Sequence, residues 1–373
     1  MATLADVTAA LEELFPARLA EPWDAVGLVC GTPTATVRRV LFAVDPVQVV
    51  ADEALAGDYD LLVAHHPLFL GGTTSLAADG PKGRVVDALV RGGCGLLVAH
   101  TNADSAFPGG VSDALAALFD LQGTSPLNAV PERLDKLVFF VPVADAEKVT
   151  AAVTDAGAGR LGHYDSCTWS STGTGTFRPL DGATPSIGEV GRLERVEEQR
   201  VETVLPRHLR RHVVQALLAA HPYETPAYDV IELADTPSRQ GMGRVGDLPS
   251  PMTVADLTDL AARVLPPTAW GVRASGDPAK VVRRLAVMGG AGDDALGLAA
   301  AAGADAFLTS DLRHHKASEA PEGLALLDAA HWATEHPWLT SAAAALARVV
   351  AAETAVSTLC TDPWTTASRS SSS

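Results

Sequence analysis

Three short apolar runs in this chain each end in side chains that can bind a metal ion. The runs cover residues 61–64, 95–99 and 324–328, and their length and apolar character predict buried strands. The metal-competent residues that follow them are, in order, His65 and His66, His100 and Asp104, and His331 and Glu335. In open parallel α/β sheets, ligands bind beyond the carboxyl ends of the strands. The pattern therefore predicts an α/β fold with a ligand site at the ends of these strands.

The residue types at these strand ends are suited to divalent metals. His331 and Glu335 stand four residues apart, so they share one face if the segment is a helix. Imidazoles and carboxylates in this number exceed what one tetrahedral zinc needs and suit two ions about 3.5–4 Å apart with a bridging carboxylate. Taken alone, the pair His65–His66 is more often one packed and one solvated histidine than a metal site. The metal interpretation depends on all three strand ends.

Alternation of helical and strand patterns divides the chain into segments. Residues 1–125 alternate between the two patterns, which predicts a mainly parallel sheet covered by helices. Residues 126–238 have the strand-helix-strands-helix-strand order of a ferredoxin-like α+β domain. The alternation of helical and strand patterns seen in residues 1–125 resumes over residues 239–365. Residues 366–373 form a polar tail predicted to be disordered. The predicted architecture is a two-lobed, mostly parallel α/β metal-binding domain interrupted by an inserted α+β domain.

Three local expectations follow from glycine, proline and polar residues. The Ser/Thr/Gly-rich stretch 170–176 is predicted to be a hairpin or loop. Residues 289–292, Gly-Gly-Ala-Gly, are read as a tight turn between a strand and a helix, and they match neither a GxGxxG fingerprint nor a Walker A loop. A closing helix is expected over residues 338–352.

Composition excludes several classes of protein. The formal net charge of -17 over 373 residues argues against broad binding to a nucleic-acid backbone. The four cysteines form no CxxC pair, which favours a reduced, cytoplasmic compartment over a disulfide framework. No uninterrupted apolar stretch reaches the ~20 residues that a membrane span requires. The N-terminal pattern predicts an amphipathic helix over residues 3–15 and no signal peptide.

Six motifs, taken in order, give the chain a resemblance to one known family. They are Glu21-Pro22-Trp23-Asp24-Ala25-Val26-Gly27-Leu28, His65-His66-Pro67-Leu68, His100-Thr101-Asn102-Ala103-Asp104, Gly241-Met242-Gly243-Arg244-Val245-Gly246, Gly303-Ala304-Asp305 to Asp311, and His331 to Glu335. Together they are similar to the Nif-three-like dinuclear metal centre proteins, which also carry the name GTP cyclohydrolase 1 type 2 homologs. The resemblance covers about residues 3 to 360, and the middle segment resembles long members with an inserted PII-like or CutA-like domain.

The resemblance implies a toroidal homohexamer with two metal ions in each subunit. The matching metal positions are His65, His66, Asp104, His331 and Glu335. The implied sharing puts His66 and Asp104 on one ion and His65 and His331 on the other, with Glu335 between the two. One departure from the family is Lys316, which stands where many members carry an acid.

Two further histidines are candidate proton carriers. His315 is either a group that moves protons near the metals or an ordinary surface histidine. His100 either orients a metal ligand or is a buried histidine bonded to backbone at a strand end. Asp24, which follows Trp23, is expected to hold a loop. His221 and Glu224 are flanked by Pro222 and Pro226, which favours a structural turn over a ligand site.

Two functions of different classes are compatible with this pattern. The first is a metal-dependent hydrolase that uses a metal-activated water on an unknown small molecule, which the family name suggests is a nucleotide. The second is a regulatory or scaffold hexamer that binds metal without catalysis. Imidazole and carboxylate ligands suit zinc or iron first, then manganese, cobalt or nickel. We expect no membrane partner and no nucleic acid.

Overall fold

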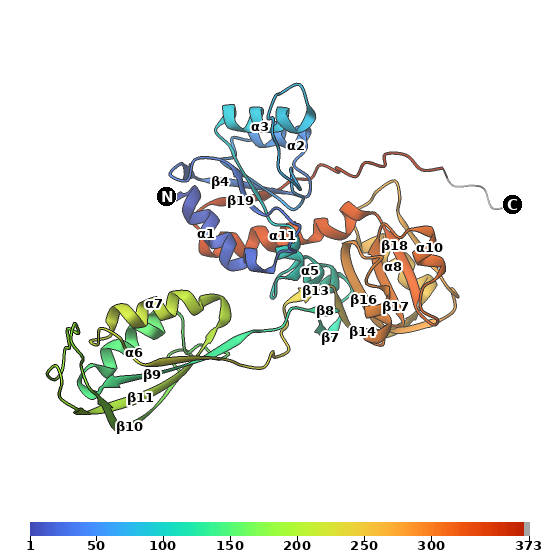
Figure 1. Ribbon diagram of the computed structural model, residues 1–373. Coiled ribbons are helices and arrows are strands. Elements are labelled where there is room, and N and C mark those ends of the chain that lie inside the picture. Colours follow the sequence, from blue (N-terminus) through green and yellow to red (C-terminus); the bar gives the residue numbers. More distant parts are fainter. Residues whose placement is uncertain (369–373) are drawn as a thin grey trace. The chain divides into compact units, whose positions relative to one another are not determined.

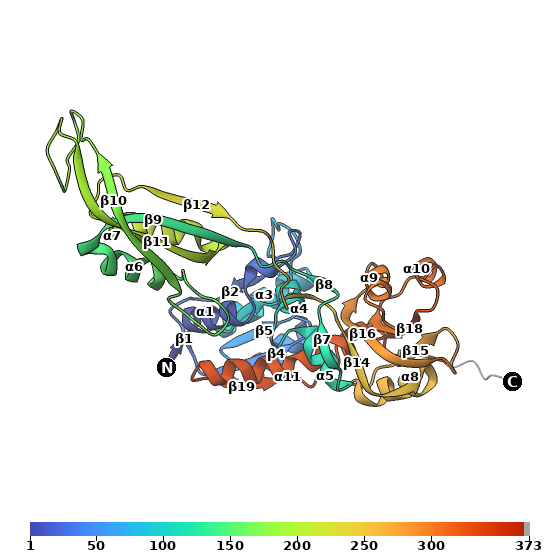
Figure 2. The same cartoon turned by 90° about the horizontal axis from the view of Figure 1, so that it is seen from below.

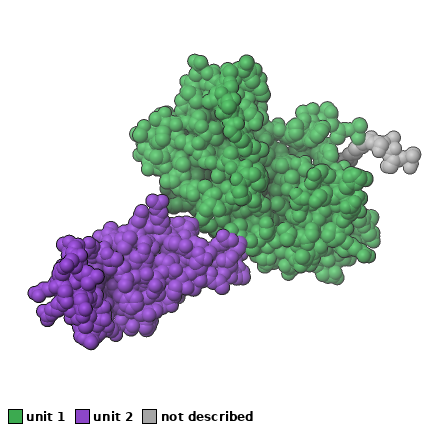
Figure 3. All heavy atoms as spheres, viewed as in Figure 1, with its two compact units in different colours: residues 1–130, 239–373 green, residues 131–238 purple. Residues whose placement is uncertain are grey.

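The computed structural model describes residues 1–368, which form two compact units (Figure 3). Unit 1 combines residues 1–130 with residues 239–368, and unit 2 consists of residues 131–238. The tail predicted at residues 366–373 lies mostly outside the described residues. Unit 2 is therefore an insertion into the sequence of unit 1.

The first sheet of unit 1 has the order β19-β4-β5-β6-β2. Its strands are β2 (Gly27–Cys30), β4 (Arg39–Ala43), β5 (Leu61–Ala64), β6 (Gly95–Val98) and β19 (Glu353–Val356). Only the β2–β6 pairing is antiparallel, so the prediction of a mostly parallel sheet is confirmed here. Successive residues of β5 point to opposite faces, which is why this apolar run is buried on both sides.

Helices cover both faces of the first sheet (Figure 1). They are α1 (Leu4–Leu14), α2 (Gln48–Ala56) and α3 (Pro81–Gly92). Leu61 and Val63 share a core cluster with residues of α1, whereas Leu62 and Ala64 pack with residues of α2 and α3. Helix α1 starts after Thr3, whose hydroxyl accepts the backbone N–H of Asp6 and so caps the first turn.

The second sheet of unit 1 has the order β15-β18-β17-β16-β14-β7. Its strands are β7 (Gln122–Ser125), β14 (Arg244–Thr253), β15 (Val272–Ser275), β16 (Val281–Ala291), β17 (Ala306–Ser310) and β18 (Ala325–Ala329), and its helices are α8 (Val254–Val264), α9 (Leu296–Ala301) and α10 (His314–Ser318). Only the pairings of β17 with β16 and β18 are parallel. The prediction of a mostly parallel sheet is wrong for this lobe, because β14 turns back along β16 and edge strands on both sides add antiparallel pairings.

The two lobes of unit 1 exchange elements. Strand β7 from the N-terminal part joins the second sheet, and β19 from the C-terminal part joins the first. Helices α5 (Val111–Leu118) and α11 (His331–Val349) pack against each other in a core shared by both sheets. The remaining short elements are β1 (Ala2–Thr3), β3 (Thr36–Val37), α4 (Thr101–Ser105), β8 (Asn128–Ala129) and β13 (Gly241–Met242). Because the lobes share strands and a core, unit 1 is one folding unit.

Helix α11 begins earlier than the sequence predicts. The closing helix was expected over residues 338–352, but it starts at His331, passes through Pro337 and ends at Val349. Figure 2 shows α11 running from the second sheet towards β19 of the first. The metal-competent residues at its start therefore belong to a helix that packs into the core of the unit, where the Trp338 side chain is fully buried.

The Gly-rich segment before β14 is explained by Arg244. Its guanidinium is 1% exposed, pairs with Asp113 of α5, and donates to the carbonyls of Gly241, Gly243 and Ala106. A buried charge is tolerated only when it is paired and its hydrogen bonds are made. Gly243 has a φ of +66° and, like Gly241, leaves no room for a Cβ. The ion pair between Arg244 and Asp113 thus connects the start of β14, in the second lobe, to α5.

Unit 2 is an antiparallel sheet with two helices on one face. Its elements are β9 (Leu134–Pro142), α6 (Ala146–Asp155), β10 (Thr168–Phe177), β11 (Glu194–Pro206), α7 (Arg210–Ala220) and β12 (Tyr228–Glu232). The order β10-β11-β9-β12 is that of the ferredoxin-like pattern. Residues 170–176, predicted to be a hairpin or loop, are the centre of β10, which forms an antiparallel hairpin with β11; the hairpin alternative is confirmed and the loop alternative is wrong.

Removing unit 2 should leave unit 1 folded. The backbone N–H of Val130 donates to the carbonyl of Gln240 at 2.9 Å, so the chain ends left by deleting residues 131–238 lie side by side. A short Gly/Ser linker from Val130 to Arg239 therefore closes the gap at a small entropic cost. We expect a soluble protein that unfolds cooperatively and keeps the wild-type metal content, measured by circular dichroism and elemental analysis. An insoluble or metal-free product would contradict this division.

Candidate metal centre

The strand ends of unit 1 bring the predicted side chains together. His65 and His66 follow β5 directly, and His100 lies between β6 and α4. Among the described residues, two groups have ligand atoms within 4.8 Å of one another: His65, His66 and His100 form one, and His66, His331 and Glu335 form the other. His66 belongs to both groups. The two clusters are therefore one continuous site.

Two of the histidines are oriented by carboxylates. Nδ1 of His66 lies 2.7 Å from Oδ1 of Asp45, and Nδ1 of His331 lies 2.7 Å from Oδ2 of Asp311. A carboxylate at Nδ1 accepts the proton there and leaves Nε2 as the metal-binding nitrogen. The two Nε2 atoms are 3.2 Å apart. Two nitrogens bound to one tetrahedral zinc lie roughly 3.4 Å apart, so one ion fits both imidazoles.

The other two histidines are fixed from the N-terminal lobe. Nδ1 of the fully buried His65 lies 2.9 Å from the carbonyl of Ala99. Nδ1 of His100 lies 2.9 Å from Asp24, whose other oxygen accepts the backbone N–H of Thr101. Asp24 thus does more than hold a loop, because it orients the imidazole of His100. In both rings, Nε2 is the nitrogen that remains available to bind a metal ion.

The Glu335 carboxylate stands among three imidazoles. Its Oε1 is 2.9 Å from Nε2 of His331 and 3.4 Å from Nε2 of His65, and its Oε2 is 3.0 Å from Nε2 of His66. Asp104 belongs to neither metal-competent group, although its Oδ1 lies 3.8 Å from Nε2 of His65. The arrangement is that of a carboxylate shared between two groups of ligands.

Several of these atoms are buried without a hydrogen bond. They include Nε2 of His65, Oδ1 of Asp104 and Oε2 of Glu335. Leaving a buried polar atom unpaired costs about 1–3 kcal/mol, and native proteins contain few such atoms. Carboxylate oxygens and imidazole nitrogens that converge on one point in this way are the ligands that a metal cation binds. The donor set therefore fits divalent metal ions, although their identity does not follow from it.

Gly290 makes room for the carboxylate. Its φ is +66°, and a Cβ at this position would come within 2.5 Å of Oε1 of Glu335 and 3.1 Å of Nε2 of His331. The backbone N–H of Gly290 donates to the hydroxyl of Thr334 at 2.9 Å. Residues 289–291 belong to the end of β16, so the prediction of a strand-to-helix turn is wrong here. A glycine at position 290 is therefore required for Glu335 and His331 to take these positions.

Electrostatics of the cluster follow from burial and close charges. Burial disfavours the imidazolium form, but the Glu335 carboxylate and hydrogen bonds to Asp45 and Asp311 outweigh it and raise the pKa of His66 to about 10 and that of His331 to about 11. Burial likewise opposes ionisation of Glu335, yet the surrounding imidazoles hold its pKa well below the usual range. In the metal-free protein, His66 and His331 are therefore protonated at neutral pH. Their positive charges balance the carboxylate of Glu335, as metal ions would.

The pKa values of Asp104 and His100 are shifted mainly by burial, which keeps both groups closer to their neutral forms. Burial raises the pKa of Asp104 to about 7. Burial and the neighbouring His65 lower the pKa of His100, so this imidazole is neutral at physiological pH. A neutral imidazole is the form that binds metal. Its Nε2 makes His100 a candidate ligand in addition to a candidate proton carrier.

His315 does not join the cluster. It is exposed on α10, and neither metal-competent group of the described residues contains it. Its ring contacts that of His314, with 5.3 Å between centroids. The neighbouring Lys316 pairs with Asp294 at 2.8 Å on the surface. The prediction that His315 carries protons at the metals gains no support from this position.

Asp45 and Asp311 were missed by the sequence reasoning. Each follows the carboxyl end of a parallel strand, β4 and β17 respectively, within two residues. The rule that identified His65 and His100 also applies to them. They were overlooked because acids after strands are common as loop residues, and their partners lie far away in sequence.

A cavity of about 730 Å³ opens onto the centre. Its wall includes His66, His100 and His331, and it also contains residues of β18 and of the segment after β19. This volume lies in the range of small-molecule sites. The metal-competent nitrogens are therefore reachable by a ligand of moderate size.

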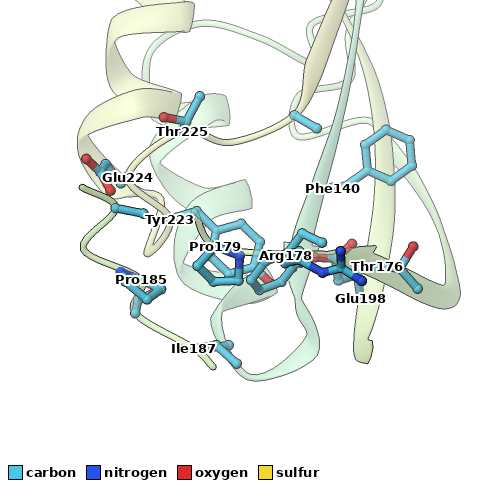
Figure 4. Close-up of a pocket in the computed structure, with 15 residues that line it drawn as sticks. Phe140, Thr176, Arg178, Pro179, Pro185, Ile187, Glu198, Tyr223, Glu224 and Thr225 are labelled. Atoms are coloured by element: carbon cyan, nitrogen blue, oxygen red, sulfur yellow. Dashed lines mark hydrogen bonds between the residues drawn. The ribbon is translucent and has the colours of Figure 1, made fainter. Parts of the chain in front are cut away.

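Unit 2 contains a separate cavity of about 340 Å³ (Figure 4). There the hydroxyl of Tyr223 donates to Glu198 at 2.8 Å. His221 is held at both nitrogens, since Nε2 lies 2.9 Å from the carbonyl of Phe140 and Nδ1 accepts the backbone N–H of Tyr223. Both ring nitrogens of His221 therefore contact the backbone, as in a histidine that holds a turn.

Comparison with known proteins extends over nearly the whole chain. The model of the Duf34/NIF3 (NGG1p interacting factor 3) family matches residues 2–363. The GTP cyclohydrolase 1 type 2 homolog of Mycobacterium tuberculosis is 49% identical over 367 residues, covering 97% of this chain and 96% of that protein. The homolog of the same name from Bacillus subtilis is 39% identical over 86% of each chain.

Solved structures agree with these matches. A Bacillus cereus protein described as related to NIF3 superimposes with a TM-score of 0.85 at 36% identity, covering 97% of this chain and 98% of that one. The Staphylococcus aureus protein SA1388 gives a TM-score of 0.77 at 28% identity with the same coverage. Over residues 1–368, none of the helices is both long and apolar enough to cross a bilayer.

Proposed function

This chain belongs to the Duf34/NIF3 family, and we propose that it is a metal-dependent hydrolase acting on a small molecule held above two neighbouring divalent ions. The observation that carries this proposal is the cavity of about 730 Å³ whose wall contains the metal-competent His66, His100 and His331. A storage or purely structural metal site is closed by its ligands, whereas a catalytic site leaves a position open to substrate.

The distances support a ligand distribution different from the one that the resemblance implies. Nε2 of His66 is 3.2 Å from that of His331, and Nε2 of His65 is 3.8 Å from Oδ1 of Asp104. We assign His66 and His331 to one ion, His65, His100 and Asp104 to the other, and Glu335 to both. Zinc or iron is our first choice of metal, followed by manganese, cobalt and nickel.

When bound, two such ions supply a water nucleophile that is ionised near neutral pH and polarise an electrophilic carbon or phosphorus centre. The chain's own residues prepare the site for this. Asp45 and Asp311 fix the imidazoles of His66 and His331 through Nδ1, so the rings do not reorient during turnover. The name GTP cyclohydrolase 1 type 2 homolog, carried by relatives, favours attack on a ring carbon of a cyclic amide or amidine.

The alternative is a metal-binding scaffold without catalysis. It would use the same ligands but would have no need of an open cavity beside them. The toroidal homohexamer implied by the family resemblance stays a prediction under either function, and size-exclusion chromatography with light scattering tests it.

Restoration of hydrolysis by metal tests the proposal. Protein stripped by a chelator should be inactive on a panel of cyclic amides, nucleosides and phosphoesters, and should regain activity after addition of zinc or anaerobic iron(II). The double variant His65→Ala/His66→Ala should stay inactive. The matched control is His314→Ala/His315→Ala, which removes an adjacent histidine pair outside the cluster. Two bound ions with no metal-dependent turnover on the whole panel would favour the scaffold.

A further inference from the structure

The sheet of unit 2 has one face that its helices do not cover. Helices α6 and α7 share a core cluster with Phe139 and other residues of β9. Successive residues of a strand point to opposite faces, so the neighbouring Phe140 lies on the uncovered face. The registers of β9, β11 and β10 place Glu198, Gly173 and Gly175 on that same face. The Ser/Thr/Gly-rich centre of β10 therefore lies beside Glu198.

Two cavities, of about 340 and 280 Å³, open on this face, and both have Phe140, Gly175 and Glu198 in their walls (Figure 4). Neither Gly173 nor Gly175 has a positive φ, so the backbone does not require glycine there. Glycine inside a strand costs stability and often marks a place where a ligand approaches closely. A Cβ at Gly175 would collide with the Glu198 carboxylate, and a Cβ at Gly173 would meet no atom within 4 Å. The glycines thus leave a hollow around Glu198.

Glu198 presents one carboxylate oxygen to this hollow. The residue is 8% exposed, and the hydroxyl of Tyr223 donates to its Oε1 at 2.8 Å. Burial and the hydrogen bond to Glu198 raise the pKa of Tyr223, so the hydroxyl keeps its proton. Within residues 1–368, Oε2 of Glu198 receives no hydrogen bond, and it is not one of the fully buried atoms. Oε2 is therefore the oxygen that a ligand in the cavities can reach.

Other acids of the same sheet are paired with cations. Asp135 is paired with Arg210 at 2.7 Å, and Glu202 is paired with Arg200 at 2.8 Å. In the described part of the chain, no lysine or arginine forms an ion pair with Glu198. A buried charge is tolerated in proteins when an opposite charge stands beside it. Glu198 thus lacks the cation that its neighbours have, and the cavities offer space for one.

We propose that these cavities bind a small organic ammonium ion, whose charged group pairs with Oε2 of Glu198 and whose apolar body lies against Phe140, Phe177 and Tyr223. The site lies in unit 2 and does not depend on the proposed hydrolase. The rings of Phe177 and Tyr223 meet edge to face, with centroids 5.5 Å apart. Such rings give apolar contact to the body of the ligand, and their faces attract a cation.

The charges around the cavities favour an organic cation over other ligands. Arg178 lines the first cavity, but it is exposed, so solvent screens its charge more than that of the buried Glu198. Arg200 lines the second cavity and is already paired with Glu202. A metal ion needs several converging ligands, and among the described residues Glu198 belongs to neither metal-competent group.

Ligands that differ only in charge test this assignment. Phenethylammonium and isoamylammonium are titrated into the full-length protein by calorimetry, in phosphate buffer, beside the carboxylates of matching shape, hydrocinnamate and isocaproate. Wild-type protein should bind at least one ammonium ion saturably, and at least about tenfold more tightly than its carboxylate counterpart, since a hydrogen bond to a charged group is worth that much. This comparison uses no variant, so it decides even if a variant does not fold.

Variants locate the binding. Glu198→Gln keeps the size of the side chain but removes its charge, and it should weaken the ammonium ion by at least about tenfold. The matched control Glu197→Gln removes an exposed charge from the next position of β11 and should keep the wild-type affinity. The double variant His65→Ala/His66→Ala should also keep it, because the metal centre lies in unit 1. Calcium added to this double variant should not displace the ammonium ion.

Four results would overturn the inference. They are equal wild-type affinities for the ammonium ions and the carboxylates, absence of saturable binding of either ammonium ion, an affinity retained in Glu198→Gln, and displacement by calcium. Loss of binding in His65→Ala/His66→Ala would also contradict it, because the ammonium ion would then lie at the metal centre.

Discussion

Replacing Glu335 with alanine should reduce the metal content from about two ions per chain to one or none. The Glu335 carboxylate lies within 3.4 Å of Nε2 of His65, His66 and His331, so its removal takes a ligand from both groups at once. Alanine is a good helix former, and α11 should keep its helical signal. Elemental analysis of anaerobically purified protein, alongside circular dichroism, measures both quantities.

The matched control for this variant is Glu322→Ala, which removes an exposed carboxylate from the same lobe. It should keep the wild-type metal content. If Glu335→Ala also kept that content, Glu335 would be excluded as a ligand and the assignment of a shared carboxylate would be wrong.

Metal loading at pH 7 should release at least about two protons per chain, from His66 and His331, with a further fraction from Asp104, whose pKa of about 7 leaves it partly protonated. In the metal-free protein the pKa of His66 is about 10 and that of His331 is about 11, so both imidazoles are protonated at pH 7. A metal binds only the neutral ring. Titration calorimetry of zinc into stripped protein, repeated in buffers with different enthalpies of ionisation, gives the number of protons released. An observed enthalpy that does not depend on the buffer would contradict the raised pKa values.

The same shifts set how the stability of the metal-free protein depends on pH. The folded pKa values of His66 and His331 lie above the ordinary value of 6.5. The stability that they contribute is therefore complete below pH ~6.5 and is lost as the pH rises through about 10 and 11. Metal affinity changes in the opposite direction, because higher pH removes the protons that compete with the ions. Stripped and loaded protein should accordingly diverge in thermal stability as the pH increases.

The sequence predicts the metal-competent residues better than their pairing. His65, His66 and His100 follow apolar strands, and this local pattern is enough to place them at one edge of a sheet. Which of them approaches Asp104 or His331 depends on side-chain directions and on the packing of α11 between the lobes. Those are tertiary properties that spacing along the chain does not encode.

Elements that depend on distant pairing were also beyond sequence reasoning. Strand β7 pairs with β14 across the inserted unit, and β19 pairs with β4 from the opposite end of the chain. The Ser/Thr/Gly-rich centre of β10 was predicted to be a hairpin or loop because glycine is depleted in strands, yet its threonines favour strands and its register against β11 is continuous. The segment after β19 reaches the cavity above the metal centre only through the β19–β4 pairing, so no local signal marks it.

The most direct test of the account is an anomalous diffraction measurement at the absorption edge of the metal identified by elemental analysis. We predict two anomalous peaks per chain: one beside His65, His100 and Asp104, and the other beside His66 and His331, with Glu335 between them. A single peak, or peaks away from these side chains in fully loaded crystals, would contradict a dinuclear centre at this site.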